Sequence, residues 1–154
     1  MADFFDVVRR QRGIAHFQET PIPEEALTRI LEAATRAPSG SNRQPWRFIV
    51  ITDPKVKQGL GELYLEGQRR SRGSDLPAPP ADEPPRFSHA MGALPVVVAA
   101  CVEKWPITGQ EIYRGASIYP AVQNLMLAAA AVGVGSRLTT IWQHCYQEVA
   151  DLLS

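Results

Sequence analysis

The sequence has little of what marks several common classes of protein. Its two cysteines, Cys101 and Cys145, make no motif, so a thiol-reducing cytoplasm is the default compartment. Lysine plus arginine and aspartate plus glutamate balance at 16 each, so no net field points to nucleic acid or an anionic membrane. The longest apolar runs, 94–102 and 125–134, are too short to cross a bilayer. We therefore expect a soluble cytoplasmic protein without a nucleic-acid or membrane partner.

Several catalytic motifs are missing as well. His16, His89 and His144 lie far apart, with no Asp, Glu or Cys at ligand spacing, so no metal site is indicated. Ser39 and Ser41 lack the Gly-x-Ser-x-Gly elbow of a serine hydrolase. The chain contains no P-loop, and its aromatic residues, 8% of the total, do not alternate with basic ones as a nucleic-acid stacking platform would require.

The most informative stretch is 37–46, which reads APSGSNRQPW and is called the central loop below. Apolar residues at helical spacing over 27–34 precede it, and the β-branched run 48–51 follows it as a short buried strand. At ten residues the loop is longer than the usual connection, and long loops often carry function. Two interpretations stay open: a plain loop after a helix stop, or a binding site whose amide and hydroxyl groups suit a flat heterocycle.

A second feature is the cluster of Arg9, Arg10 and Arg12 near the start of the chain. Asp3 is a fair N-cap for a first helix, and the three arginines stand where that helix should end. Cations at this position complement the helix dipole. Guanidinium forks also match phosphate oxygens. The residues alone leave a structural role and a phosphate site equally open.

The run APSGSNRQPWRFIV at 37–50 resembles the signature of the nitroreductase family, the FMN-dependent flavoproteins. Three more segments are similar to the family and follow its order. They are RQRGIAHF at 10–17, PIPEEALTRILEAA at 21–34 and YPAVQNLMLAAAAVGVGSRLTT at 119–140. The resemblance covers most of the chain except its middle.

This resemblance implies an α+β fold of three layers, α/β/α, with a central, mainly antiparallel sheet flanked by helices. It further implies one domain, 1–154, in which 71–93 is a loop or lid, and FMN bound at a homodimer interface. The implied reaction passes a hydride from NADH or NADPH through the flavin to a nitroaromatic, quinone or similar acceptor. The alternative is a degenerate protein of the same fold that binds FMN without turnover. Family members usually continue beyond the point where this sequence stops, so we expect their C-terminal segment to be absent.

The resemblance also assigns site residues. It implies that Arg12, with Gly13 beside it, meets the FMN phosphate; Ala15 stands where part of the family has a second arginine. The segment similar to the one that lines the flavin face contributes Leu138, Thr139 and Thr140. No residue is expected to act as a catalytic acid or base, and no metal is expected. The residues expected to meet the flavin ring and ribityl chain are Pro38, Ser39, Gly40, Asn42 and Gln44.

Periodicity and capping signals predict the remaining elements. We expect strands at 46–52, 94–102 and 136–141, and helices at 119–132 and 146–153. A third helix follows the Asp53-Pro54 turn, although Gly59 and Gly61 weaken the pattern in its first half. The helix at 119–132 is apolar nearly all round, which is typical of a helix buried in a core or at a subunit interface, and Gly133 is placed to end it.

Overall fold

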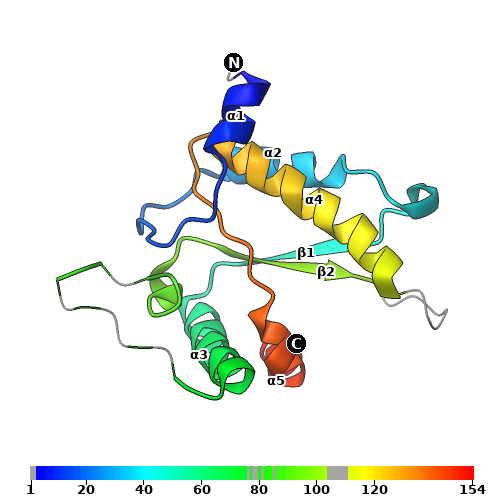
Figure 1. Ribbon diagram of the computed structural model, residues 1–154. Helices are drawn as coiled ribbons and strands as arrows, with labels where there is room; N and C mark the ends of the chain where they lie inside the picture. The colour runs from blue at the N-terminus through cyan, green and yellow to red at the C-terminus, as the bar shows by residue number, and fades with distance from the viewer. Residues whose placement is uncertain (1–2, 76, 78–79, 81, 85, 104–110) are drawn as a thin grey trace. The chain divides into compact units, whose positions relative to one another are not determined.

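The computed structural model of the protein describes residues 3–75, 77, 80, 82–84, 86–103 and 111–154 (Figure 1). Its longer elements are α1 (Phe4–Arg10), α2 (Glu24–Thr35), β1 (Trp46–Ile51), α3 (Pro54–Arg72), β2 (Val97–Val102), α4 (Glu111–Ala131) and α5 (Tyr146–Leu152). The described residues also form the short 3₁₀ helices η1 (Gly40–Asn42), η2 (Met91–Ala93) and η3 (Ile141–Cys145). The predicted α+β class is confirmed.

The chain divides into two compact units. The first comprises Met1–Gly13, Ile22–Val50 and Val98–Ser136. The second comprises Ile14–Pro21, Ile51–Val97 and Arg137–Ser154.

In the first unit, α4 is the helix against which the other elements pack. It contacts α2 along much of its length and contacts α1 and η1 at separate places. Ile30 and Ala34 are the buried residues of α2. The Asn124 side-chain amide donates to the Ala33 carbonyl at 3.2 Å, so this polar residue bridges to a neighbouring backbone. Its position on an apolar helix is thereby explained without a ligand.

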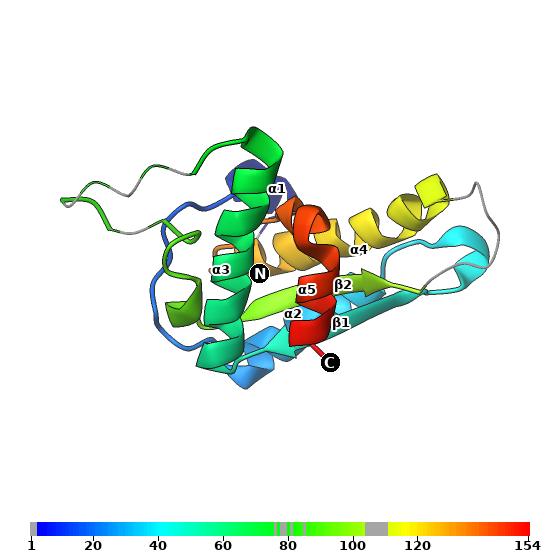
Figure 2. The same cartoon turned by 90° about the horizontal axis from the view of Figure 1, so that it is seen from below.

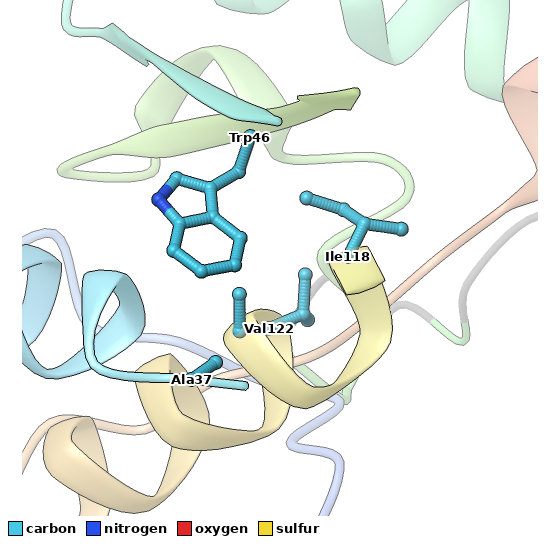
Figure 3. Packing of buried hydrophobic residues seen from close by; sticks show 5 residues of the cluster. Ala37, Trp46, Ile118 and Val122 are labelled. Carbon is cyan, nitrogen blue, oxygen red and sulfur yellow. The ribbon is translucent and has the colours of Figure 1, made fainter. Parts of the chain in front are cut away.

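The core of the first unit is a cluster built around the Trp46 ring. Its other members are Ala37, Ile118, Ala121 and Val122, all buried (Figure 3). Trp46 and Ala37 are the two ends of the central loop, and the remaining three residues belong to α4. Both ends of the loop are therefore fixed to the same helix by buried apolar contact.

The two strands pair in an antiparallel sheet. The Glu103 amide, just after β2, donates to the Pro45 carbonyl, just before β1, at 2.9 Å, so the end of one strand lies beside the start of the other. The Arg47 guanidinium pairs with the Glu103 carboxylate. The prediction that the first strand is buried is wrong for this chain, because Ile49 and Val50 are 41% and 36% exposed. The second strand, predicted from 94, begins at Val97 and is half-buried.

Helix α4 is longer than the sequence predicted. It begins at Glu111 rather than near 119, and Pro120 lies inside it. Proline is favoured in the first turn of a helix, which is why the prediction began there. The C-terminus was predicted correctly: Gly133 has φ of +79°, and the Val134 amide donates to the Ala129 carbonyl at 2.8 Å, as in a Schellman motif.

The predicted strand at 136–141 is wrong. Ser136 makes an isolated parallel bridge with Gly13, and the chain then enters η3 at Ile141. The Thr139 hydroxyl accepts from the Ile141 amide at 3.3 Å. Threonine side chains that bond nearby backbone in this way compete with strand pairing. Apolar and β-branched residues were present, but no neighbouring strand continues the ladder in the part of the chain that the structure describes.

In the second unit α3 contacts η2, η3 and α5 (Figure 2). Two glycines of α3, Gly61 and Gly67, lie where other elements approach the helix. A Cβ at Gly61 would lie 3.0 Å from the Met91 Cβ, and one at Gly67 would lie 2.9 Å from the Ile141 carbonyl oxygen. The missing side chains therefore let η2 and η3 approach the helix closely.

An aromatic cluster fills the interior of the second unit. The ring centroid of Tyr64 lies 5.1 Å from that of Phe87 and 6.3 Å from that of Trp142, both in edge-on geometry. Phe87 and Met91 are buried, so part of the predicted loop or lid at 71–93 is anchored in this cluster. The same range also includes the end of α3 and all of η2. Residues 76, 78–79, 81 and 85 of that range lie outside the described residues, and the lid stays a prediction.

Charged side chains connect α3 to the C-terminal helix. The Glu66 carboxylate accepts hydrogen bonds from Arg69 at 2.6 and 2.7 Å and from Arg70 at 2.7 Å. Arg70 also donates to Glu148 on α5 and to the His144 carbonyl, both at 2.8 Å. The hydrogen bonds from Arg69 and then Arg70 lower the pKa of Glu66 from 4.5 to about 2. Glu66 thus stays ionised in the fold at a pH where it would be protonated in the unfolded chain.

We expect this carboxylate to make the protein less stable in acid. A depressed pKa contributes stability that is fully present above pH 4.5 and is lost as the pH falls toward about 2. Glu66→Gln should therefore show a shallower fall of the free energy of unfolding than the wild type, measured by urea unfolding at several pH values in this window. The control is Glu62→Gln on the same helix, since Glu62 accepts from the neutral amide of Gln58 at 3.2 Å. Equal pH slopes for wild type and Glu66→Gln would contradict the expectation.

Candidate functional site

The central loop is fixed at its ends and exposed in its middle. Ala37, Pro45 and Trp46 are buried, whereas residues 40–44 are exposed. Ser39 organises the turn, because its hydroxyl accepts from the Gln44 amide at 2.9 Å and its carbonyl accepts from the Asn42 amide at 3.0 Å. The loop is thus a compact turn that presents polar side chains outward.

The backbone of the loop is strained. Ser41 and Asn42 have φ of +52° and Gln44 has φ of +51°, a region that non-glycine residues rarely occupy. Each such residue costs roughly 1–3 kcal/mol and persists only where its surroundings hold it. Gly40 does not have a positive φ, and the positive angles fall on the three polar residues. Strain concentrated on exposed amide and hydroxyl side chains makes the loop a candidate functional site.

A serine of α4 makes a hydrogen bond to the backbone of the central loop. The Gly40 amide donates to the Ser117 hydroxyl at 3.3 Å, and that hydroxyl donates to the Tyr113 carbonyl at 3.4 Å. Ser117 is buried. Sequence reasoning missed this residue; its one signal is a small polar side chain just before the apolar stretch of the helix.

The predicted phosphate residue Arg12 lies at the end of α1. Its guanidinium donates to the Arg10 carbonyl at 3.2 Å and to the Arg9 carbonyl at 3.4 Å, while the side chain remains exposed. Arg9 itself pairs with Asp6. In this geometry Arg12 satisfies carbonyls at the C-terminus of the helix, as the structural interpretation of the cluster expected. Gly13 follows and makes the bridge to Ser136.

Within one chain, Arg12 and the central loop lie beside different parts of α4. The Gln11 side chain contacts the Met126 sulfur at 3.7 Å, and the loop contacts Ser117. These contacts are nine positions apart, or about 14 Å along a helix that rises 1.5 Å per residue. Within one copy of the first unit, the loop and the segment before Arg12 therefore contact α4 at separate places.

The other predicted site residues belong to the second unit. Leu138 and Thr140 are exposed, and Thr139 is half-buried in the irregular segment before η3. The same unit contains a shallow depression of about 360 Å³, and no predicted cofactor residue lines it. Its lining residues are Glu62, Leu65, Glu66, Arg69, Asp75 and His89.

Two other kinds of site find no support in the described part of the chain. Among these residues, no three His, Cys, Asp or Glu side chains come together as metal ligands, and no helix is long and apolar enough to span a membrane. Cys101 and Cys145 are free thiols. Burial raises the pKa of both, which disfavours the reactive thiolate.

Comparison with known proteins places the chain in a family. The sequence matches the profile of the nitroreductase family over residues 8–154, and the chain belongs to that family. Protein DrgA of Synechocystis sp. is 32% identical over an alignment of 154 residues that covers 87% of this chain and 69% of that protein. Iodotyrosine deiodinase 1 of Rattus norvegicus is 33% identical over 64 residues, which cover 42% of this chain and 22% of that protein. The chain thus spans only part of the relatives it matches.

A solved structure agrees with this assignment. The crystal structure of a nitroreductase with bound FMN from Bacteroides fragilis has a TM-score of 0.75 to this chain at 22% identity. The likeness covers 99% of this chain and 79% of that chain. At such identity it establishes the fold, and the predicted nitroreductase-like α+β fold is confirmed.

Proposed function

We propose that this protein is an FMN-dependent oxidoreductase that transfers a hydride from NADH or NADPH, through the flavin, to a nitroaromatic, quinone or similar acceptor. The observation that carries the proposal is the strained central loop, in which Ser41, Asn42 and Gln44 adopt left-handed backbone angles while their side chains face outward. Strain of this kind collects at ligand-binding sites, where the bound group benefits from a preset geometry. Membership of the nitroreductase family supports the same class of reaction.

The residues present fit FMN chemically. Asn42 and Gln44 are exposed amides that donate and accept, as the carbonyl and ring-nitrogen edges of a flavin require. Arg12 offers a guanidinium fork for the phosphate. FMN, when bound, supplies the redox chemistry, and the protein supplies binding, orientation and electrostatics. We assign Pro38, Ser39, Gly40, Asn42 and Gln44 to the ring and ribityl chain, Arg12 and Gly13 to the phosphate, and Leu138, Thr139 and Thr140 to the ring face.

We further propose that the site forms in a homodimer, with the central loop of one chain meeting Arg12 of the other. The separation of the two segments along α4 is consistent with this arrangement, because the loop and the segment before Arg12 contact that helix about 14 Å apart. Exposed apolar side chains support it too: Phe4 and Phe5 on α1 and Ile49 on β1 lie on the surface of the single chain. Light scattering of the FMN-bound protein should give twice the chain mass, and a monomer would contradict the proposal.

The test of the proposed function has two parts. The purified protein, or the protein incubated with FMN, should show the visible absorption of a bound flavin, and the released cofactor should co-migrate with FMN rather than FAD. The loaded protein should then oxidise NADH or NADPH with menadione or nitrofurazone as acceptor. Flavin binding without turnover would favour the alternative of a flavin-sequestering protein. The cofactor assignment would be refuted if excess FMN produced no flavin spectrum and no shift in melting temperature.

Asn42 offers a direct test of the loop. Asn42→Ala should weaken FMN binding about 2-fold to 12-fold, because a side-chain hydrogen bond is worth roughly 0.5–1.5 kcal/mol. The affinity is measured by titrating FMN-free protein with FMN. Alanine also strains the backbone, since Asn42 has φ of +52°.

The variant Asn42→Gly separates these two causes. Glycine accepts the left-handed conformation and lacks the amide. If the side chain binds the flavin, both variants lose affinity to a similar extent. An unchanged FMN affinity in Asn42→Gly would mean that the Asn42 side chain has only a structural role.

A further inference from the structure

The segment 138–140, which is assigned to the face of the flavin ring, runs directly into the short helix η3. The Thr139 hydroxyl accepts from the Ile141 amide at 3.3 Å, so the segment is bonded to the first residue of η3. Leu138 and Thr140 are exposed. The place of these outward-facing residues therefore depends on where η3 lies.

Helix α3 determines the position of η3 through a residue without a side chain. Gly67 is a buried residue of α3, and a Cβ there would lie 2.9 Å from the Ile141 carbonyl oxygen. Real Cβ atoms essentially never come so close to a neighbouring atom, and a backbone oxygen cannot rotate away as the end of a side chain can. Any larger residue at this position must therefore shift the backbone of η3 away from α3.

A second contact fixes η3 to the same side of α3. The Trp142 indole N–H donates to the Leu60 carbonyl at 3.0 Å, and its ring meets Tyr64 edge-on. Leu60 is seven positions before Gly67, or about two helical turns, so the two residues share one side of the helix. Helix α3 therefore holds η3 at two points, by a hydrogen bond at one and by close backbone approach at the other.

We propose that Gly67 is a positioning residue, which sets the place of Leu138, Thr139 and Thr140 toward the flavin by letting η3 pack against α3. The inference rests on the proposed function, because the three residues are assigned to the ring face there. It goes further by giving control of this part of the site to α3, a helix that contributes no assigned cofactor residue. A change at Gly67 should thus alter flavin binding while every assigned residue is kept.

The binding test compares two alanine variants of the same helix with the wild type. Gly67→Ala should weaken FMN binding about 2-fold to 12-fold, the effect of one lost hydrogen bond, and should shift the visible absorption of the bound flavin. Gly59→Ala is the matched control, because its Cβ would meet the end of the Leu152 side chain, which can rotate away. It should keep the wild-type affinity and spectrum. Equal affinities and spectra in Gly67→Ala and Gly59→Ala would overturn the proposal.

A second variant carries the test if Gly67→Ala does not fold. Trp142→Phe keeps an aromatic ring against Tyr64 but removes the N–H that bonds the Leu60 carbonyl. It should loosen η3 and weaken FMN binding in the same direction. An FMN affinity and a flavin spectrum that both match the wild type would then contradict the proposal.

Hydrogen exchange of the FMN-free protein separates this proposal from the proposed function. Peptides that cover η3 should exchange faster in Gly67→Ala than in Gly59→Ala and the wild type, because the displaced helix loses backbone protection. If this difference is found and the wild type binds no FMN, the positioning of the segment by α3 is supported and only the proposed cofactor has failed. Equal exchange in all three proteins overturns the role of Gly67, whatever the FMN titrations show.

Discussion

Replacing Trp46 with alanine is expected to lower the free energy of unfolding by about 3–5 kcal/mol, the range for truncating a buried large aromatic residue. The ring fills the cluster that Ala37, Ile118 and Val122 complete, and its loss would leave a cavity between the strand and α4 (Figure 3). Because a domain of this size is stable by only about 5–15 kcal/mol, this is the largest stability change we predict. Urea unfolding followed by circular dichroism measures it.

Two controls define the cause of that loss. Trp46→Phe keeps most of the buried apolar area, so it should cost much less than the alanine variant. Tyr146→Ala removes an aromatic ring that is 75% exposed and should change stability by no more than about 0.5 kcal/mol. A Trp46→Ala protein as stable as Tyr146→Ala would mean that the cluster contributes little to the fold.

The second large effect concerns cofactor affinity. Arg12→Ala should weaken FMN binding about 10-fold to 150-fold, because a hydrogen bond to a charged group is worth roughly 1.5–3 kcal/mol. The side chain of the nearby Ala15 offers no hydrogen bond that would compensate for the lost guanidinium. Fluorescence titration of FMN into the FMN-free protein gives the dissociation constants.

The same variant discriminates between the two interpretations of the arginine cluster. In the structure Arg12 donates to the carbonyls of Arg9 and Arg10, so a purely capping role predicts a small loss of stability and an unchanged FMN affinity. Arg9→Ala is the matched control, since Arg9 pairs with Asp6 at the same end of α1. Equal FMN affinities for Arg12→Ala, Arg9→Ala and the wild type would assign Arg12 to the helix terminus alone.

The sequence predicted best the features that local chemistry controls. A turn at Asp53 was predicted before the third helix, and the Asp53 side chain accepts from the amides of Lys55 and Val56 as the N-cap of α3. Asp3 caps α1, and Gly133 terminates α4. Each is a short-range effect of one side chain, or of its absence, on adjacent backbone, so a single sequence suffices to find it. The central loop was located for a similar reason: its boundaries are a helix stop and the start of a β-branched run.

Features that depend on distant partners were missed. The run after Ser136 has strand-like residues but finds Gly13 as its bridge partner and then turns. The strand at 46–52 reads as buried, yet a two-stranded sheet leaves Ile49 exposed. Ser117 joins the site because Gly40, far away in sequence, lies beside it in the fold. Composition and periodicity indicate the secondary structure that a segment favours. Strand pairing, strand burial and the contact of Ser117 with Gly40 depend instead on which segments lie side by side in the fold.

The spacing of contacts along α4 sets a limit on how the gene can vary in length. Gly40 meets the helix at Ser117, and Gln11 meets it at Met126. Inserting or deleting one residue between these points would turn one contact by about 100° relative to the other and shift it by about 1.5 Å. Length changes among functional descendants of this chain should therefore avoid the turns between Ser117 and Met126, even where substitutions are tolerated. The length of α4 between Ser117 and Met126 is therefore constrained by two segments that are distant from each other in the sequence.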